Sequence, residues 1–242
     1  MTDSTSIKYI GSSRESYSPT NIDFDNTSLQ IFDVPAIYDD EQTTHELQLN
    51  HQGDNYKLVS GIYYYDGESC GQFEAILGIL GQSLGAPGLT REVSGCSNSN
   101  SKAAYIQSSI DLTDKWSMTL GARYTKDKKE AQVNNGLIFD IVYPESGWVP
   151  GYTRPEGQLV PTVLDDEEEW SRFTPRAGVE YQYNRDIMFF ASYAQGFKSG
   201  TFNPRATTAE PAAKPEIVDS FEIGMKSEWN NNLRANVTLF TL

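Results

Sequence analysis

Apolar and polar residues alternate along several segments of the chain, and an alternation with a period of two is typical of β-strands. In the segment 116–125, apolar residues hold the even positions from Trp116 to Tyr124, and polar or small residues hold the odd positions. No long segment shows the helical spacing of i, i+3, i+4 and i+7, so we expect an all-β fold. The expected strands, nine in number, cover residues 6–17, 46–50, 56–65, 104–112, 116–125, 172–183, 189–197, 217–229 and 233–239.

The connections between these segments alternate strictly between short and long. Short polar turns are expected at 51–54, 112–115, 183–186 and 230–232, and long connections at about 18–41, 67–101, 131–168 and 199–215. In an antiparallel up-and-down sheet, this order places every short turn at one end and every long loop at the other. Membrane β-barrels have this asymmetry, whereas several loops of more than about 15 residues are uncommon in a compact soluble domain.

Aromatic residues recur at a spacing that suits a membrane. Trp116 and Tyr124 are eight residues apart on one face of a strand, about 26 Å at ~3.3 Å per residue. With a strand tilt of about 40°, this is about 20 Å along the membrane normal, near the ~25 Å apolar band of a barrel. Phe221 and Trp229 repeat the spacing. We therefore expect the apolar row that contains Phe189 to face lipid.

Composition narrows the possible functions and locations. The formal net charge of −14 argues against a nucleic-acid partner, which would require clustered basic surface. No run of about 18 apolar residues occurs, so we expect no membrane-spanning helix. The segment 1–6 is polar and is not a secretory signal peptide. The chain is therefore either cytoplasmic or a piece of a protein whose export signal lies upstream.

The two cysteines, Cys70 and Cys96, lie in one stretch rich in Gly, Ser and Asn. In an exported protein we expect them to form a disulfide that closes this loop. In a cytosolic protein, two isolated thiols would carry little information, and no spacing rule decides between these cases.

The acidic run 165–169 and one long connection contain candidate binding residues. Five adjacent carboxylates are typical of a solvated loop, and the alternative is a divalent-cation site that could bridge to lipopolysaccharide phosphates. Tyr143, Trp148 and Tyr152 could stack on an extracellular ligand, or they could pack their own loop against itself. These three are the candidate ligand-binding residues.

No constellation in the sequence indicates an enzyme or a bound cofactor. His45 and His51, the only histidines, lack an obvious third metal ligand, so we interpret them as interface or turn residues. No Gly-x-Ser-x-Gly elbow and no Walker or dinucleotide glycine motif occurs. We therefore expect no catalytic residues, no cofactor and no metal ligands.

Two segments resemble consecutive strands of TonB-dependent outer-membrane receptors. They are FTPRAGVEYQYNRDIMFFASYAQGFKSGTFNP at 173–204 and KPEIVDSFEIGMKSEWNNNLRANVTLF at 214–240. Residues 44–50 and 120–129 are similar to further barrel strands of this family. The resemblance implies that Glu216 and Glu222 lie at the lumen or the rim.

The resemblance also implies a transport function and a set of partners. It implies a receptor in the bacterial outer membrane, in contact with its lipid, that takes up a scarce extracellular ligand at its external loops. The commonest ligand of the family is an iron–siderophore complex, with cobalamin and glycans as alternatives. The TonB–ExbB–ExbD complex energises uptake through a plug domain, and no enzyme activity is implied.

The chain departs from the pattern of a whole receptor, which has a plugged 22-stranded barrel. We expect residues 1–242 to be a fragment of the β-barrel domain, without the signal peptide, the plug and the C-terminal strands. Two other functions stay open at this point. One is a passive porin or structural barrel, and the other is a soluble β-sandwich that binds carbohydrate.

Overall fold

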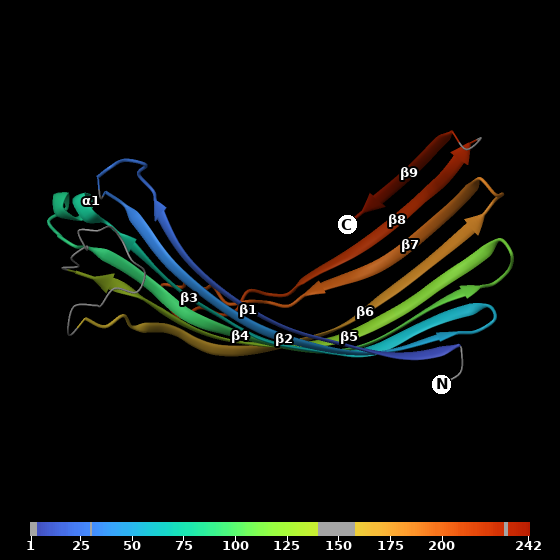
Figure 1. The fold of residues 1–242 in the computed structure, drawn as a ribbon, viewed down its shortest axis with the longest axis horizontal. Helices are drawn as coiled ribbons and strands as arrows, with labels where there is room; N and C mark the ends of the chain where they lie inside the picture. Colours follow the sequence, from blue (N-terminus) through green and yellow to red (C-terminus); the bar gives the residue numbers. More distant parts are fainter. Residues whose placement is uncertain (1–3, 30, 140–157, 230–231) are drawn as a thin grey trace.

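The computed structural model describes residues 4–29, 31–139, 158–229 and 232–242. The nine described strands form one sheet in chain order, and each strand is antiparallel to the next. Figure 1 shows a single curved layer, with the short turns at one end and the helix at the other. The elements are β1 (Thr5–Asp23), β2 (Asp33–Gln52), β3 (Tyr56–Ile76), α1 (Gly78–Ser83), β4 (Thr90–Asp111), β5 (Trp116–Ile138), β6 (Thr162–Gln182), β7 (Ile187–Lys198), β8 (Glu216–Trp229) and β9 (Leu233–Thr241).

The all-β class, the up-and-down order and the number of strands confirm the expectation from the sequence. A β-sandwich needs two packed sheets, and the described residues form only one. We call the end of the sheet that carries the short turns the turn end, and the opposite end the loop end. The one helix among the described residues, α1, lies at the loop end and has six residues.

The strands are longer than expected, and the long connections are correspondingly shorter. β4 begins at Thr90 rather than near residue 104, and β5 continues to Ile138. These extensions are paired in register, as where Ser97 lies opposite Ser69 and Ala131. Because the extended parts carry polar residues on both faces, they lose the alternation from which a strand can be recognised.

Side chains of the sheet fall into two registers, which we call the outer and the inner face. The outer face carries the apolar rows. In one row, cross-strand pairing links the residues Leu120, Ala177, Tyr193, Phe221 and Thr241 of β5 to β9. Phe189 and Ile223, on this face, are 42% and 60% exposed. No described protein segment covers these side chains, so their apolar surface requires another apolar medium.

Aromatic residues of the outer face gather at two levels. Trp116 packs against Tyr181 near the turn end, with ring centroids 4.5 Å apart, and Tyr124 lies opposite Phe173 further along. The spacing of eight residues predicted from two strands occurs in three further strands. The pairs are Tyr56 and Tyr64, Trp116 and Tyr124, Phe173 and Tyr181, Phe189 and Phe197, and Phe221 and Trp229.

The two histidines also lie at these aromatic levels. The Nδ1 atom of His45 is 2.7 Å from the Tyr9 hydroxyl, and the His45 ring stacks on Tyr9 and Tyr64. The Nδ1 atom of His51, nearer the turn end, is 2.8 Å from the Thr5 hydroxyl. Both histidines therefore lie within β2 at the aromatic levels of the outer face, and neither lies in a turn.

None of the described helices has the length and apolar character needed to cross a membrane.

Candidate functional site

The connection between β7 and β8, residues 199–215, folds back over the inner face of the sheet at the loop end. Thr201 and Ala213 form a β-bridge that closes the connection, and the Ala213 amide donates to the Thr201 carbonyl at 2.8 Å. Phe202, only 5% exposed, inserts from this loop into an apolar cluster. The other buried members of the cluster are Val93, Ala131, Val133, Leu164 and Ala206. The loop is therefore an integral part of the fold.

A close approach at Gly200 sets the path of this loop. A Cβ atom at Gly200 would lie 2.1 Å from the Ala213 carbonyl oxygen and 2.6 Å from the indole ring of Trp170. Only glycine allows the backbone to come this near to both groups. This close approach explains why a glycine follows Lys198 and Ser199 after the end of β7.

Two asparagines fix the far part of the loop. The side-chain oxygen of Asn203 accepts a hydrogen bond from the Arg205 amide at 3.0 Å, and its side-chain nitrogen donates to Glu210 at 2.8 Å. Asn135 of β5, which is 8% exposed, donates to the Ala206 carbonyl at 2.7 Å. The loop is thus attached to the sheet by both apolar and polar contacts.

A cavity of about 280 Å³ lies between this loop and the sheet. Tyr38, Phe73 and Phe202 give it aromatic walls. The guanidinium carbon of Arg205 lies 5.1 Å from the centre of the Phe73 ring, which is within the range of a cation–π interaction. A held guanidinium beside aromatic rings suits a polar organic ligand that has flat groups and anionic oxygens.

The disulfide between Cys70 and Cys96 lies in the sheet and not in a loop. The two residues are directly opposite each other on β3 and β4, and their sulfur atoms are bonded. Cys96 is also among the residues that line the cavity. The expected bond is present, but its expected place in a loop is wrong, because the Gly/Ser/Asn-rich stretch is itself paired strand.

The acidic run 165–169 also lies in a strand, β6, rather than in a solvated loop. It faces lysines of β5, and Lys128 lies 2.8 Å from Glu167 and 2.6 Å from Glu130. These hydrogen bonds, first the one to Glu130, raise the pKa of Lys128, which lies beyond the second aromatic level. The negative charge of the acidic run is therefore balanced by the lysines that lie opposite it on β5, and the run does not need a loop conformation.

Three other carboxylates converge at the loop end. Within the described ranges, the acidic group compact enough to hold a cation consists of Asp23, Asp25 and Asp33, whose oxygens lie within 4.8 Å of one another. Asp25 accepts hydrogen bonds from the Thr27 hydroxyl and the Phe32 amide, and the Thr27 bond is the main cause of its lowered pKa. Burial, and then the charges of Asp23 and Asp25, raise the pKa of Asp33.

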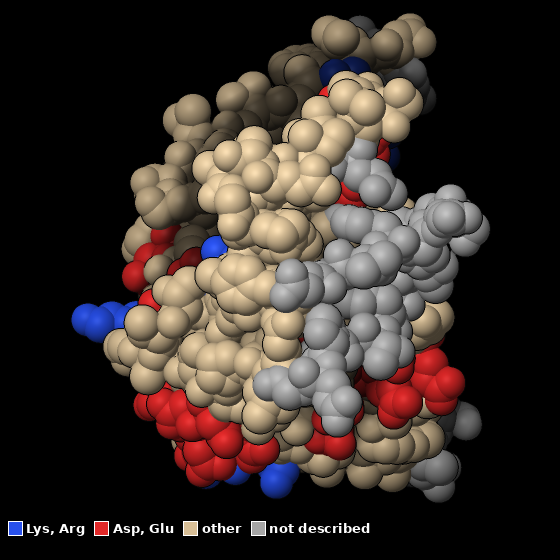
Figure 2. Space-filling model, turned by 90° about the vertical axis from the view of Figure 1, so that its left-hand side faces the viewer, with Lys and Arg blue, Asp and Glu red and all other residues tan. Residues whose placement is uncertain are grey.

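The loop end is rich in acidic side chains over a wider area (Figure 2). Cross-strand pairing on the outer face places Glu15 opposite Glu41, and Glu41 opposite Glu68. The same row continues through Asn98 to Glu130 and Glu167. Like charges directly opposite each other destabilise a sheet, so this row has a cost in stability.

The inner face below the cavity is polar. The guanidinium carbon of Arg123 lies 5.5 Å and 5.9 Å from the ring centres of Tyr63 and Tyr105. The Tyr105 hydroxyl donates to Glu46 at 2.6 Å. Glu222 shares this inner face. The face opposite the apolar rows thus suits contact with water or with polar protein.

The structure describes some of the residues that the sequence singled out and not others. Tyr143, Trp148 and Tyr152 lie outside the described residues. Sequence reasoning gave no individual role to Phe202, although this residue lies within the segment 173–204 that resembles barrel strands, and it did not consider Arg205. Their partners on the sheet, Phe73 and Val133, have no local signal in the sequence.

The sequence matches the family described as "TonB dependent receptor-like, beta-barrel" over residues 3–242. The chain belongs to this family. The apolar outer face, the polar inner face and the loop folded over the inner face agree with this membership.

Solved structures with the same fold include several receptors. The ferric yersiniabactin uptake receptor FyuA from Yersinia pestis has a TM-score of 0.78 and 16% identity, and the match covers 99% of this chain and 33% of that one. The siderophore receptor PiuA from Acinetobacter baumannii has a TM-score of 0.67 and 17% identity, covering 99% and 38%. The ferric citrate transporter FecA in its unliganded form has a TM-score of 0.59 and 13% identity, covering 98% and 32%. The chain therefore spans about a third of the length of these receptors.

Proposed function

We propose that this chain is part of an outer-membrane receptor that takes up an iron–siderophore complex. The observation that carries the proposal is the cavity of about 280 Å³ beneath the β7–β8 loop, where Arg205 lies over Phe73. Ferric chelates present oxygen atoms of negative charge around a compact centre. A guanidinium that is fixed on an aromatic ring binds such oxygens with little further loss of side-chain freedom.

The position of the cavity supports uptake at the external surface. It lies on the inner face at the loop end, beyond the second aromatic level. In a receptor with this fold, that place is the external mouth of the lumen. The solved structures with the highest TM-scores above carry names that refer to ferric or siderophore uptake, which favours the same class of ligand.

The remaining parts of the proposal concern the whole receptor. We infer that residues 1–242 are one part of the β-barrel domain, that the plug belongs to the rest of the protein, and that the TonB–ExbB–ExbD complex acts through that plug. The protein is then located in the bacterial outer membrane. Tyr143, Trp148 and Tyr152 remain proposed ligand contacts of the same mouth.

Uptake of radiolabelled ferric siderophores by cells that carry the natural gene tests this proposal. The variant is Arg205→Ala, and the matched control is Arg185→Ala at the turn end. Loss of a charge-assisted hydrogen bond of about 1.5–3 kcal/mol lowers affinity by about tenfold or more. We expect this loss for Arg205→Ala and wild-type affinity for Arg185→Ala.

Two results would contradict the proposal. Equal uptake by Arg205→Ala and Arg185→Ala would show that the cavity does not take part in uptake. Uptake that continues after the proton gradient is collapsed would indicate a passive porin. Labelled cobalamin and oligosaccharides, measured in the same cells, identify the ligand class if no siderophore is taken up.

A further inference from the structure

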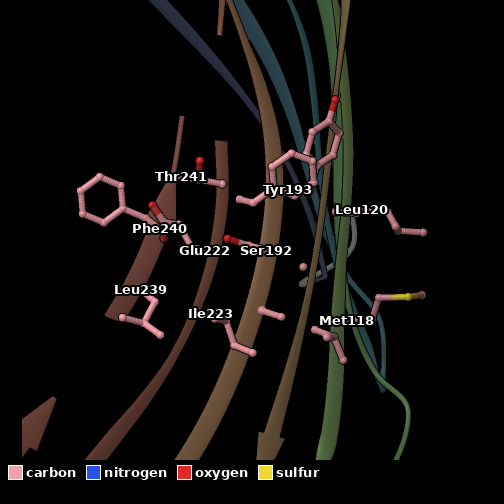
Figure 3. A pocket seen from close by; sticks show the side chains of 14 residues that line it. Met118, Leu120, Ser192, Tyr193, Glu222, Ile223, Leu239, Phe240 and Thr241 are labelled. Atoms are coloured by element: carbon pink, nitrogen blue, oxygen red, sulfur yellow. The ribbon is translucent and has the colours of Figure 1, made fainter. Parts of the chain in front are cut away.

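The outer face has a shallow apolar hollow of about 660 Å³ that extends across β5 to β9. Figure 3 shows Met118 and Leu120 of β5 on one side and Ile223 and Leu239 on the other, with Tyr193 toward the top of the view. The hollow is separate from the cavity under the β7–β8 loop, because the two share no lining residue and most residues that line the hollow belong to the outer face.

Two alanines create the hollow. Ala177 of β6 lies opposite Leu120, and Ala191 of β7 lies opposite Ile223. Each alanine is thus a small residue with a large neighbour in the next strand, so the floor lies below the surrounding side chains. A volume of about 660 Å³ falls in the usual range of about 300–1,000 Å³ for small-molecule sites.

Polar groups lie directly beyond the end of the hollow that is nearer the loop end. The Tyr193 hydroxyl and the Gln195 side-chain amide both donate to the Oδ1 atom of Asp219 at 2.8 Å. Arg172 donates to Gln195 at 3.1 Å. The site therefore joins an apolar space to a hydrogen-bonded polar cap at the second aromatic level.

We propose that this hollow binds an acyl chain of an outer-leaflet lipid, with the lipid headgroup against Asp219 and Gln195. The order of apolar space and polar cap matches the order of chain and headgroup in a lipid. Membrane lipid surrounds the outer face on every side, so the hydrophobic effect gives no preference for this place. Retention comes from the fit of the chain against the recessed floor and from hydrogen bonds at the cap.

The test fills the hollow with a side chain. In Ala191→Phe the ring occupies the floor, and the matched control, Ala122→Phe, adds the same ring to the outer face of β5 outside the lining residues. The complete receptor that contains this chain is folded into vesicles of equal parts phosphatidylethanolamine and phosphatidylglycerol and extracted in mild detergent. Native mass spectrometry then counts the lipids that remain bound.

We expect one retained lipid on the wild-type chain and on Ala122→Phe. Ala191→Phe should lower the retained fraction at least about fivefold, the change that 1 kcal/mol produces. Equal retention by Ala191→Phe and the wild type would overturn the inference.

Because the inference rests on the membrane location in the proposed function, insertion is measured first, by the heat-dependent mobility of folded barrels in gels. A chain that inserts but retains no lipid refutes only this inference. A complete receptor that stays out of the vesicles refutes the membrane location as well.

Discussion

Truncation of Phe202 to alanine is the most informative single change in the β7–β8 loop. The phenyl ring is 5% exposed and is the large side chain by which this loop enters the buried cluster. The bridge between Thr201 and Ala213 lies within the loop and does not attach it to β5 or β6. Phe202→Ala should therefore undock the loop while the strand pairing of the sheet persists.

The size of the effect follows from the burial of the ring. A phenylalanine side chain buries about 150–250 Å², which at ~25 cal/mol per Å² gives an upper value of about 4–6 kcal/mol. Measured Phe→Ala changes in cores cost about 3–5 kcal/mol. Since a surface loop relaxes more easily than a core, we take about 3 kcal/mol, which raises the undocked fraction more than about 100-fold.

Hydrogen exchange and limited proteolysis measure this fraction. The amides of Ala206 and Ala213, which donate within the loop at 3.2 Å and 2.8 Å, should exchange faster, and trypsin should cut sooner after Arg205. Phe173→Ala, which removes a 57% exposed ring from the outer face, is the control and should leave the loop protected. Wild-type protection in Phe202→Ala would refute the view that this ring holds the loop.

Four further changes test other parts of the structure. Gly200→Ala should expose the same loop to trypsin, because its Cβ would meet backbone at 2.1 Å, and unchanged cleavage would contradict this reading. Replacement of Cys70 and Cys96 by serine should lower the free energy of unfolding by about 2–4 kcal/mol, measured by urea denaturation. The pKa of Asp25 is lowered from its ordinary value of 3.8, so its stabilising effect is full above that value and is lost as the pH falls below it. Asp25→Asn should accordingly reduce the melting temperature at pH 6, and the difference from wild type should shrink as the pH falls below 3.8. Glu41→Gln should raise stability by about 0.2–1 kcal/mol in low salt, because it removes repulsion from both neighbouring glutamates, and no gain in urea denaturation would count against that repulsion.

The sequence was sufficient for those parts of the strands that have an apolar outer face and a polar inner face. In 116–125 the two faces meet different media, and the resulting alternation identified the strand and its outer face. In 90–101 both faces carry polar residues, and the same reasoning predicted a loop where β4 is fully paired. The pairing of Cys70 with Cys96 was expected, but its place within the sheet was not.

The candidate site depends on contacts that the sequence does not encode locally. Phe202 meets Val93 and Val133, which come from strands far away in the chain. Only the register of β4, β5 and β6 brings these positions under the loop. Arg205 likewise becomes a candidate binding residue only because its guanidinium lies over the ring of Phe73, a residue of β3. A sequence motif can indicate that the loop is unusual, but the residues that line the cavity come together only when the whole sheet has formed.

We infer that the outer face contacts lipid and that the inner face does not. Single cysteines introduced in turn from Ser117 to Thr125 and spin-labelled in vesicles test it directly, since both natural cysteines are bonded. We predict that labels at even positions collide with oxygen dissolved in the bilayer, and that labels at odd positions collide with a water-soluble nickel complex. Equal collision rates along the strand, or the opposite alternation, would show that the outer face is not the lipid-facing side.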